Sequence, residues 1–87
     1  MEINQVSRLL EVHFTVVQVV LTLIAEGDDE ILELLERSGQ DGVIALCEQV
    51  SLKFELDHLH TDWDEFDYKS TVFEYSRVKL VKFAKEF

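Results

Sequence analysis

The chain has 87 residues, of which 47% are hydrophobic, and its 18 acidic and 8 basic residues produce a formal net charge of −10. This length is enough for one domain, 1–87, and the apolar fraction is high enough for a core, which argues against disorder. The negative charge argues against direct binding of DNA or RNA, because that affinity comes largely from Lys and Arg neutralising phosphates.

Residues 4–26 are predicted to form the first helix. The segment is rich in valine, which by itself favours a strand, but its polar residues recur at helical spacings and show no period of two. These polar residues are Ser7, Glu11, Thr15, Gln18, Thr22 and Glu26. Because apolar residues occupy most of the remaining circumference, we expect either a central helix or a helix that contacts another subunit.

Several features predict a cytoplasmic protein that does not bind membranes. The most apolar part of the first segment, residues 16–25, is interrupted by Gln18 and Thr22 and is predicted to be too short to span a bilayer. No basic region precedes an apolar run at the N-terminus, so no secretory signal is expected. The single cysteine, Cys47, cannot form an internal disulfide, which suits a reducing compartment.

The three glycines divide the rest of the chain. Glycine is typical of helix C-termini, and Asp28 or Asp29 and later Asp62 stand at positions suited to N-caps. The further helices are predicted at residues 29–38, 42–60 and 62–86. Residues 70–83 also contain strand-like stretches, so helix and strand both remain open there. The simplest arrangement is an all-α, small four-helix bundle, and a homodimer is an open alternative because domains of this size are often stabilised by oligomerisation.

Negative charge is concentrated in the middle of the chain. Residues 26–67 contain fourteen carboxylates and only two bases, Arg37 and Lys53, whereas residues 68–87 have a net charge of +3. Carboxylates in first helical turns are favoured by the helix dipole, which explains part of this pattern. Glu30, Glu33 and Glu36 follow one another at helical spacings where like charges repel, so an electrostatic role is indicated for them.

Residues 62–68 alternate carboxylates with large aromatic side chains. Trp and Tyr often contribute much of the binding energy at interfaces, and charge complementarity accelerates association. In the simpler alternative, Trp63 and Phe66 close the hydrophobic core where the last helix begins. The sequence leaves both interpretations open, with Tyr68 grouped with Trp63 as a residue for contacting a partner.

Catalytic and metal-binding motifs are not found in the sequence. There is no glycine-rich phosphate loop, and Cys47 lies in an apolar run without a neighbouring base. The His58 and His60 side chains are two residues apart and would diverge on a helix, so a metal site near Asp57 is disfavoured. We therefore expect neither an enzyme nor a cofactor.

The expected function is non-catalytic binding of a basic protein partner. One form is an inhibitor that occupies the nucleic-acid site of a nuclease or a nucleoprotein complex, as phage anti-defence proteins, DNA mimics and toxin-immunity proteins do. The predicted partner-binding residues are Glu30, Glu33, Glu36, Asp57, Asp62, Trp63, Asp64, Glu65, Asp67 and Tyr68. The alternative is a structural subunit or small chaperone whose first helix pairs with another chain through Val12, Val16, Val19, Val20 and Leu23.

Overall fold

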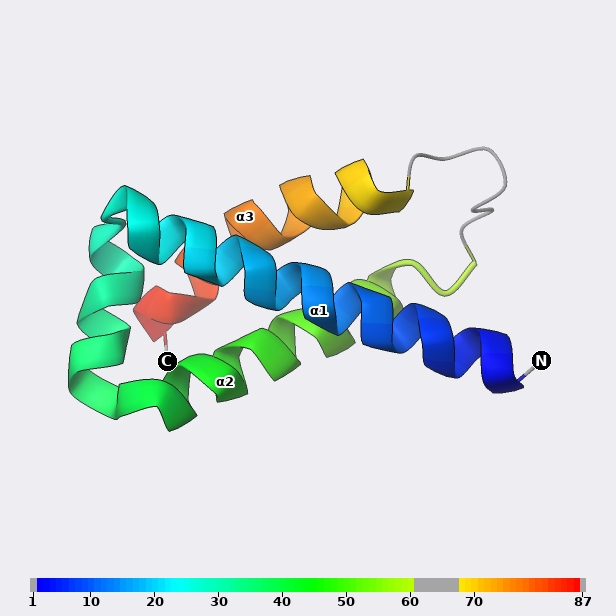
Figure 1. The fold of residues 1–87 in the computed structure, drawn as a ribbon, viewed down its shortest axis with the longest axis horizontal. Helices are drawn as coiled ribbons and strands as arrows, with labels where there is room; N and C mark the ends of the chain where they lie inside the picture. The colour runs from blue at the N-terminus through cyan, green and yellow to red at the C-terminus, as the bar shows by residue number, and fades with distance from the viewer. Residues whose placement is uncertain (1, 61–67, 87) are drawn as a thin grey trace.

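The computed structural model describes residues 2–60 and 68–86, and in this part of the chain the fold is an all-α bundle of three helices, not the four that the sequence predicts. Its helices are α1 (Glu2–Glu26), α2 (Asp29–Asp57) and α3 (Tyr68–Glu86). The second part of α2 runs antiparallel to α1, and α3 runs in the same direction as α1 (Figure 1). Each helix packs against the other two, and the bundle measures 40 × 21 × 19 Å.

The junction between α1 and α2 is a two-residue connection whose two amides are both hydrogen-bonded. Gly27 adopts a positive φ of 81°, which suits glycine at the end of a helix. The Gly27 amide donates to the Ile24 carbonyl (3.1 Å) and the Asp28 amide to the Leu23 carbonyl (3.0 Å), the pattern of a Schellman motif. Asp28 then caps α2, since its carboxylate accepts from the Ile31 amide at 3.2 Å. This confirms the predicted end of the first helix and the N-cap.

The predicted helices 29–38 and 42–60 are the two arms of one bent helix, α2. Only Gly39 leaves the helical region, with φ 69° and ψ −166°, a conformation nearly restricted to glycine. A Cβ on Gly42 would collide with the Cβ of Ser38, so a second glycine allows the two arms to approach closely. The sequence thus identified the site of the bend, but one non-helical residue replaces the loop that was expected there.

The second arm ends at Asp57, three residues before the predicted end. His58 is the C-cap residue, and its amide donates to the Phe54 carbonyl (3.1 Å). Residues 70–83 are helical within α3, which decides between the helix and the strand that the sequence left open. The predicted start of the last helix at Asp62 lies outside the described residues.

The core consists mainly of aliphatic side chains from all three helices. Its largest fully buried members include Phe54 and Ile31, and α1 contributes Val12, Val16, Val19, Val20 and Leu23. These five α1 residues are the ones that the alternative hypothesis assigned to a subunit contact. They pack inside the bundle instead, because α2 and α3 both lie against that face of α1.

We expect Gly39→Ala to destabilise the protein by about 1–3 kcal/mol, since a side chain at this φ and ψ is strained even though the surrounding space is open. Chemical denaturation followed by circular dichroism measures the change. The neighbouring exposed Gln40→Ala is the control and should change the free energy of unfolding by less than about 0.5 kcal/mol. Equal stability of the two variants would show that the bend does not depend on glycine.

We expect Ser76→Ala to stabilise the protein by about 1 kcal/mol, because the fully buried Ser76 hydroxyl has no hydrogen-bond partner among the described residues. Ser51 is the matched control. Its buried hydroxyl donates to the Cys47 carbonyl (2.8 Å) and lies 3.2 Å from His13 Nδ1, so Ser51→Ala should destabilise. A loss of stability in both variants, measured by urea denaturation, would contradict the assignment.

Candidate partner-binding surface

The first arm of α2, residues 29–38, carries the most concentrated negative charge in the described structure. Ile31 and Leu34 are fully buried and attach the arm to the core. The acidic side chains next to these two residues lie nearer the surface: Glu33 and Glu36 are exposed and Glu30 is half-buried. We call Glu30, Glu33 and Glu36 the acidic arm. The last two share a shallow depression on the surface with Arg37.

The basic residues of α3 do not pair with the acidic arm. Arg77 Nη2 forms an ion pair with Glu26 Oε1 at 2.7 Å, which joins α3 to the end of α1. Lys79 Nζ lies 5.5 Å from the centre of the Tyr75 ring. Arg37, on the arm itself, donates from Nη2 to the Ala84 carbonyl at 3.5 Å. Among the described residues, no ion pair neutralises a carboxylate of the acidic arm.

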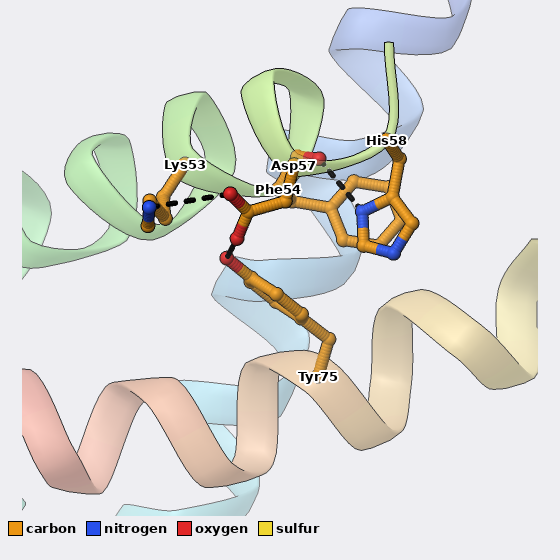
Figure 2. A network of polar contacts seen from close by, with 5 residues as sticks. All are labelled: Lys53, Phe54, Asp57, His58 and Tyr75. Atoms are coloured by element: carbon orange, nitrogen blue, oxygen red, sulfur yellow. Dashed lines mark hydrogen bonds and ion pairs between the residues drawn. The ribbon is translucent and has the colours of Figure 1, made fainter. Parts of the chain in front are cut away.

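Asp57, another predicted partner-binding residue, lies at the opposite end of α2 and belongs to a polar network (Figure 2). Its Oδ2 accepts a hydrogen bond from the Tyr75 hydroxyl at 2.8 Å, and its Oδ1 lies 3.2 Å from Lys53 Nζ. The hydrogen bond from Tyr75, followed by the one from Lys53, lowers the pKa of Asp57 below its ordinary value of 3.8. This carboxylate therefore links α2 to α3 and is not grouped with the acidic arm.

Three ring side chains in mutual contact support this network. The His58 ring lies on the Phe54 ring with centroids 4.2 Å apart, and the Tyr75 ring meets Phe54 edge-on at 5.1 Å (Figure 2). His58 Nδ1 lies 2.8 Å from the Phe54 carbonyl, so this nitrogen carries hydrogen and satisfies a carbonyl at the helix end. Burial and the hydrogen bond to Asp57 raise the pKa of Tyr75, which keeps its phenol protonated as the donor.

The rest of the predicted partner-binding set belongs to the segment 62–68. Asp62, Trp63, Asp64, Glu65 and Asp67 lie outside the described residues. Tyr68 begins α3, but its side chain is likewise outside the described part. The structure thus groups Glu30, Glu33 and Glu36, separates Asp57 from them, and leaves the acidic and aromatic segment 62–68 as a prediction.

Cys47 is buried, as its position in an apolar run predicts. Burial, together with the charge of Glu48, raises the pKa of the Cys47 thiol from 9.0 to about 11. Since the thiolate is the nucleophile, a thiol protonated at neutral pH is poorly reactive. Within residues 2–60 and 68–86, no group of three or more His, Cys, Asp or Glu side chains could hold a metal ion.

An apolar groove between α1 and the second arm of α2 was not predicted from the sequence. It comprises two adjoining depressions of about 300 and 280 Å³. The α1 side includes Leu10, His13, Val17, Leu21 and Ile24, and the α2 side includes Gln40, Ile44, Cys47, Glu48 and Leu52. Leu21 is 58% exposed and Ile44 is 52% exposed. Exposed apolar side chains gathered in one concave region are typical of a binding surface.

The signal for this groove was present in the spacing of α1 residues. Leu10, Phe14, Val17, Leu21 and Ile24 recur at intervals of four, three, four and three, which is one face of a helix. This aliphatic stripe lies beside the valine stripe that forms the core, and the apolar surface predicted for this helix includes both. Phe14 lies at the far edge, in a depression shared with Lys69 and Phe73 of α3.

The two stripes together make α1 apolar over a longer stretch than residues 16–25. The window Leu9–Glu26 is long and apolar enough to cross a membrane by length and composition, and 28% of it is buried in the bundle. The segment of residues 16–25 judged too short was therefore only part of the apolar window. Core helices of soluble proteins and signal sequences near an N-terminus meet the same criterion.

No family model, no curated protein and no solved structure matches this chain. The functional interpretation therefore depends on the chemistry of the surfaces described above.

The network around Asp57 leads to a prediction about pH. The pKa of Asp57 is lower in the folded than in the unfolded protein, so its contribution to stability is present above the unfolded value and is lost as pH falls through the folded value. We expect Tyr75→Phe to raise the pKa of Asp57 and to reduce the stability lost below pH 4. Carbon-detected NMR titration of the Asp57 carboxyl measures this, with Glu74→Gln as the control. An unchanged pKa in Tyr75→Phe would contradict the network.

Proposed function

We propose that this protein is a small, non-catalytic binding protein whose acidic surface engages and inhibits a basic protein partner. The observation that carries the proposal is the acidic arm, where Glu33 and Glu36 are exposed and form no ion pair with the described residues. Like charges at helical spacings destabilise a helix slightly, so the fold gains nothing from placing Glu36 beside Glu33. A complementary basic surface would convert this repulsion into attraction and would accelerate association.

The proposed partner is a nucleic-acid-handling protein, in particular a nuclease or a nucleoprotein complex. Such proteins present clustered Lys and Arg side chains to phosphates, and a row of carboxylates offers them a comparable charge. The acidic side chains of residues 62–67 add to the proposed contact, with Trp63 and Tyr68 as aromatic anchors. In this proposal the protein resembles phage anti-defence proteins, DNA mimics and toxin-immunity proteins in mode of action, and it works in the cytoplasm.

A second candidate function is a structural subunit or small chaperone that pairs with another chain through α1. The exposed aliphatic stripe of α1 favours it, because Leu10 and Leu21 are 64% and 58% exposed and are available for contact. The residues involved differ from those first expected, since Val12, Val16 and their neighbours belong to the core. This candidate would bind through apolar area and would persist at high salt.

Charge reversal tests the main proposal. Wild-type protein is immobilised and exposed to heparin-binding proteins from the source organism, and each captured protein is assayed for DNA and RNA binding and cleavage. We expect Glu33→Lys/Glu36→Lys to weaken capture at least tenfold and to relieve inhibition, because attraction to a basic surface becomes repulsion. Increasing salt should weaken the wild-type complex steeply.

The matched control is Glu11→Lys/Glu74→Lys, on α1 and α3, which changes the net charge equally at exposed positions away from the arm. It should retain most of the capture and inhibition. Equal loss in both double variants would mean that only total charge matters. Capture that persists at high salt would favour the second candidate function.

A further inference from the structure

We propose that the groove between α1 and the second arm of α2 is a docking site for an amphipathic helix of a protein partner, with an aliphatic stripe flanked by Lys and Arg. This surface is separate from the acidic arm, so the inference does not depend on the main proposal above; it deepens the second candidate function, which uses the same exposed side of α1. It rests on three observations: the shape of the groove, the spacing of its apolar side chains and the charge along its α2 side.

The groove has the length and shape that a helix requires. From Leu10 to Ile24 the α1 side extends about 21 Å at 1.5 Å per residue, which matches about four turns of a partner helix. The α2 side runs in the opposite direction, so Leu52 lies near Leu10, and Ile44 shares its depression with Leu21. Two adjacent antiparallel helices with a groove between them can accept a third helix, whose rows of side chains fit into that groove.

The apolar residues along the groove have the spacing of helix-packing positions. On α1, Leu10, Val17, Leu21 and Ile24 lie on one face, and α2 contributes Ile44 and Leu52 to the opposite wall. Helices that lie in such grooves are bound through side chains at positions i, i+3, i+4 and i+7. The described bundle has three helices, so a helix in this groove would complete a four-helix arrangement around α1 and α2.

The charges beside the groove select a basic occupant. Asp41, Glu48 and Glu55 repeat at intervals of seven, which places them along one face of the second arm, and Glu48 lines the groove itself. Asp41 and Glu48 are exposed. No Lys or Arg occurs in residues 9–26, and the single base of residues 40–57, Lys53, pairs with Asp57. A partner helix with Lys or Arg along its flank would meet this acidic row.

The same argument disfavours the two other occupants. A second copy would bring its own Asp41 and Glu48 and a net charge of −10 to an acidic surface. An anionic lipid surface would be repelled in the same way. The chain also contains an example of the favoured arrangement, because α3, with its excess of basic residues, packs against α1 and α2 and pairs Arg77 with Glu26.

The test uses a synthetic 18-residue helical peptide that has leucine at intervals of three and four, lysine on both flanks and alanine elsewhere. Binding of the fluorescein-labelled peptide is measured by anisotropy at 0.15 M salt. We expect the wild-type protein to bind this peptide at least tenfold more tightly than a scrambled peptide of identical composition. Replacement of every lysine by glutamate should abolish binding.

Variants of the protein separate apolar docking from simple charge attraction. Leu21→Glu and Ile44→Glu should each weaken peptide binding at least tenfold, although each makes the protein more negative and therefore more attractive to lysine. The control Val78→Glu adds the same charge at a position of α3 that is 64% exposed and should bind normally. Circular dichroism confirms that each variant is folded.

Other outcomes would overturn the proposal. Equal binding of the ordered and scrambled peptides would indicate non-specific charge attraction. A stable wild-type dimer in sedimentation equilibrium that Leu21→Glu dissociates would assign the groove to a second copy. Flotation with phosphatidylcholine vesicles that Leu21→Glu abolishes would assign it to lipid. Since Glu33→Lys/Glu36→Lys leaves the groove intact, its normal peptide binding would separate this result from the test of the acidic arm.

Discussion

The fold depends on the packing of the α1 valine stripe against both other helices. Val12, Val16 and Val19 are fully buried, and they meet core residues of α2 such as Leu46 and Phe54. In a domain of this size, few side chains can be fully buried, so the loss of one contact surface would remove much of the core. Every other feature of the molecule, including the bend in α2 and the exposed surfaces, is arranged around this stripe.

The bend at Gly39 determines where the acidic charge lies. A straight helix of 29 residues would extend about 44 Å, which is longer than the 40 Å extent of the whole bundle. The bend instead lets the first arm cover one end of the bundle while the second arm packs along α1 (Figure 1). Arg37 contacts the Ala84 carbonyl near the end of α3, so this arm is also joined to the last helix. The acidic arm therefore lies at one end of the bundle, on a helical segment that packs against the core and contacts α3.

Only some of the carboxylates take part in ion pairs or hydrogen bonds between helices. Glu26 and Asp57 are joined to α3 by Arg77 and Tyr75, which lie two residues apart near the middle of that helix. Ion pairs at exposed positions add little stability, so the remaining carboxylates on the surface do not need partners for the fold to persist. That leaves two surfaces for recognition, one acidic and one apolar with an acidic border, and both are complementary to basic proteins.

Sequence by itself determined the helical class, the connection at Gly27 and Asp28, the burial of Cys47 and the uneven distribution of charge. These features depend on local preferences or on residue identity, which are visible in a single chain. Tertiary structure decided whether residues 39–42 form a loop or a bend, which apolar stripe of α1 enters the core and which carboxylates are engaged. Periodicity shows that two stripes exist on α1, but only the positions of α2 and α3 determine that the valines are buried while Leu21 is exposed. The same holds for Asp57, whose partner Tyr75 is 18 residues away and is brought to it only by the packing of α3 on α2.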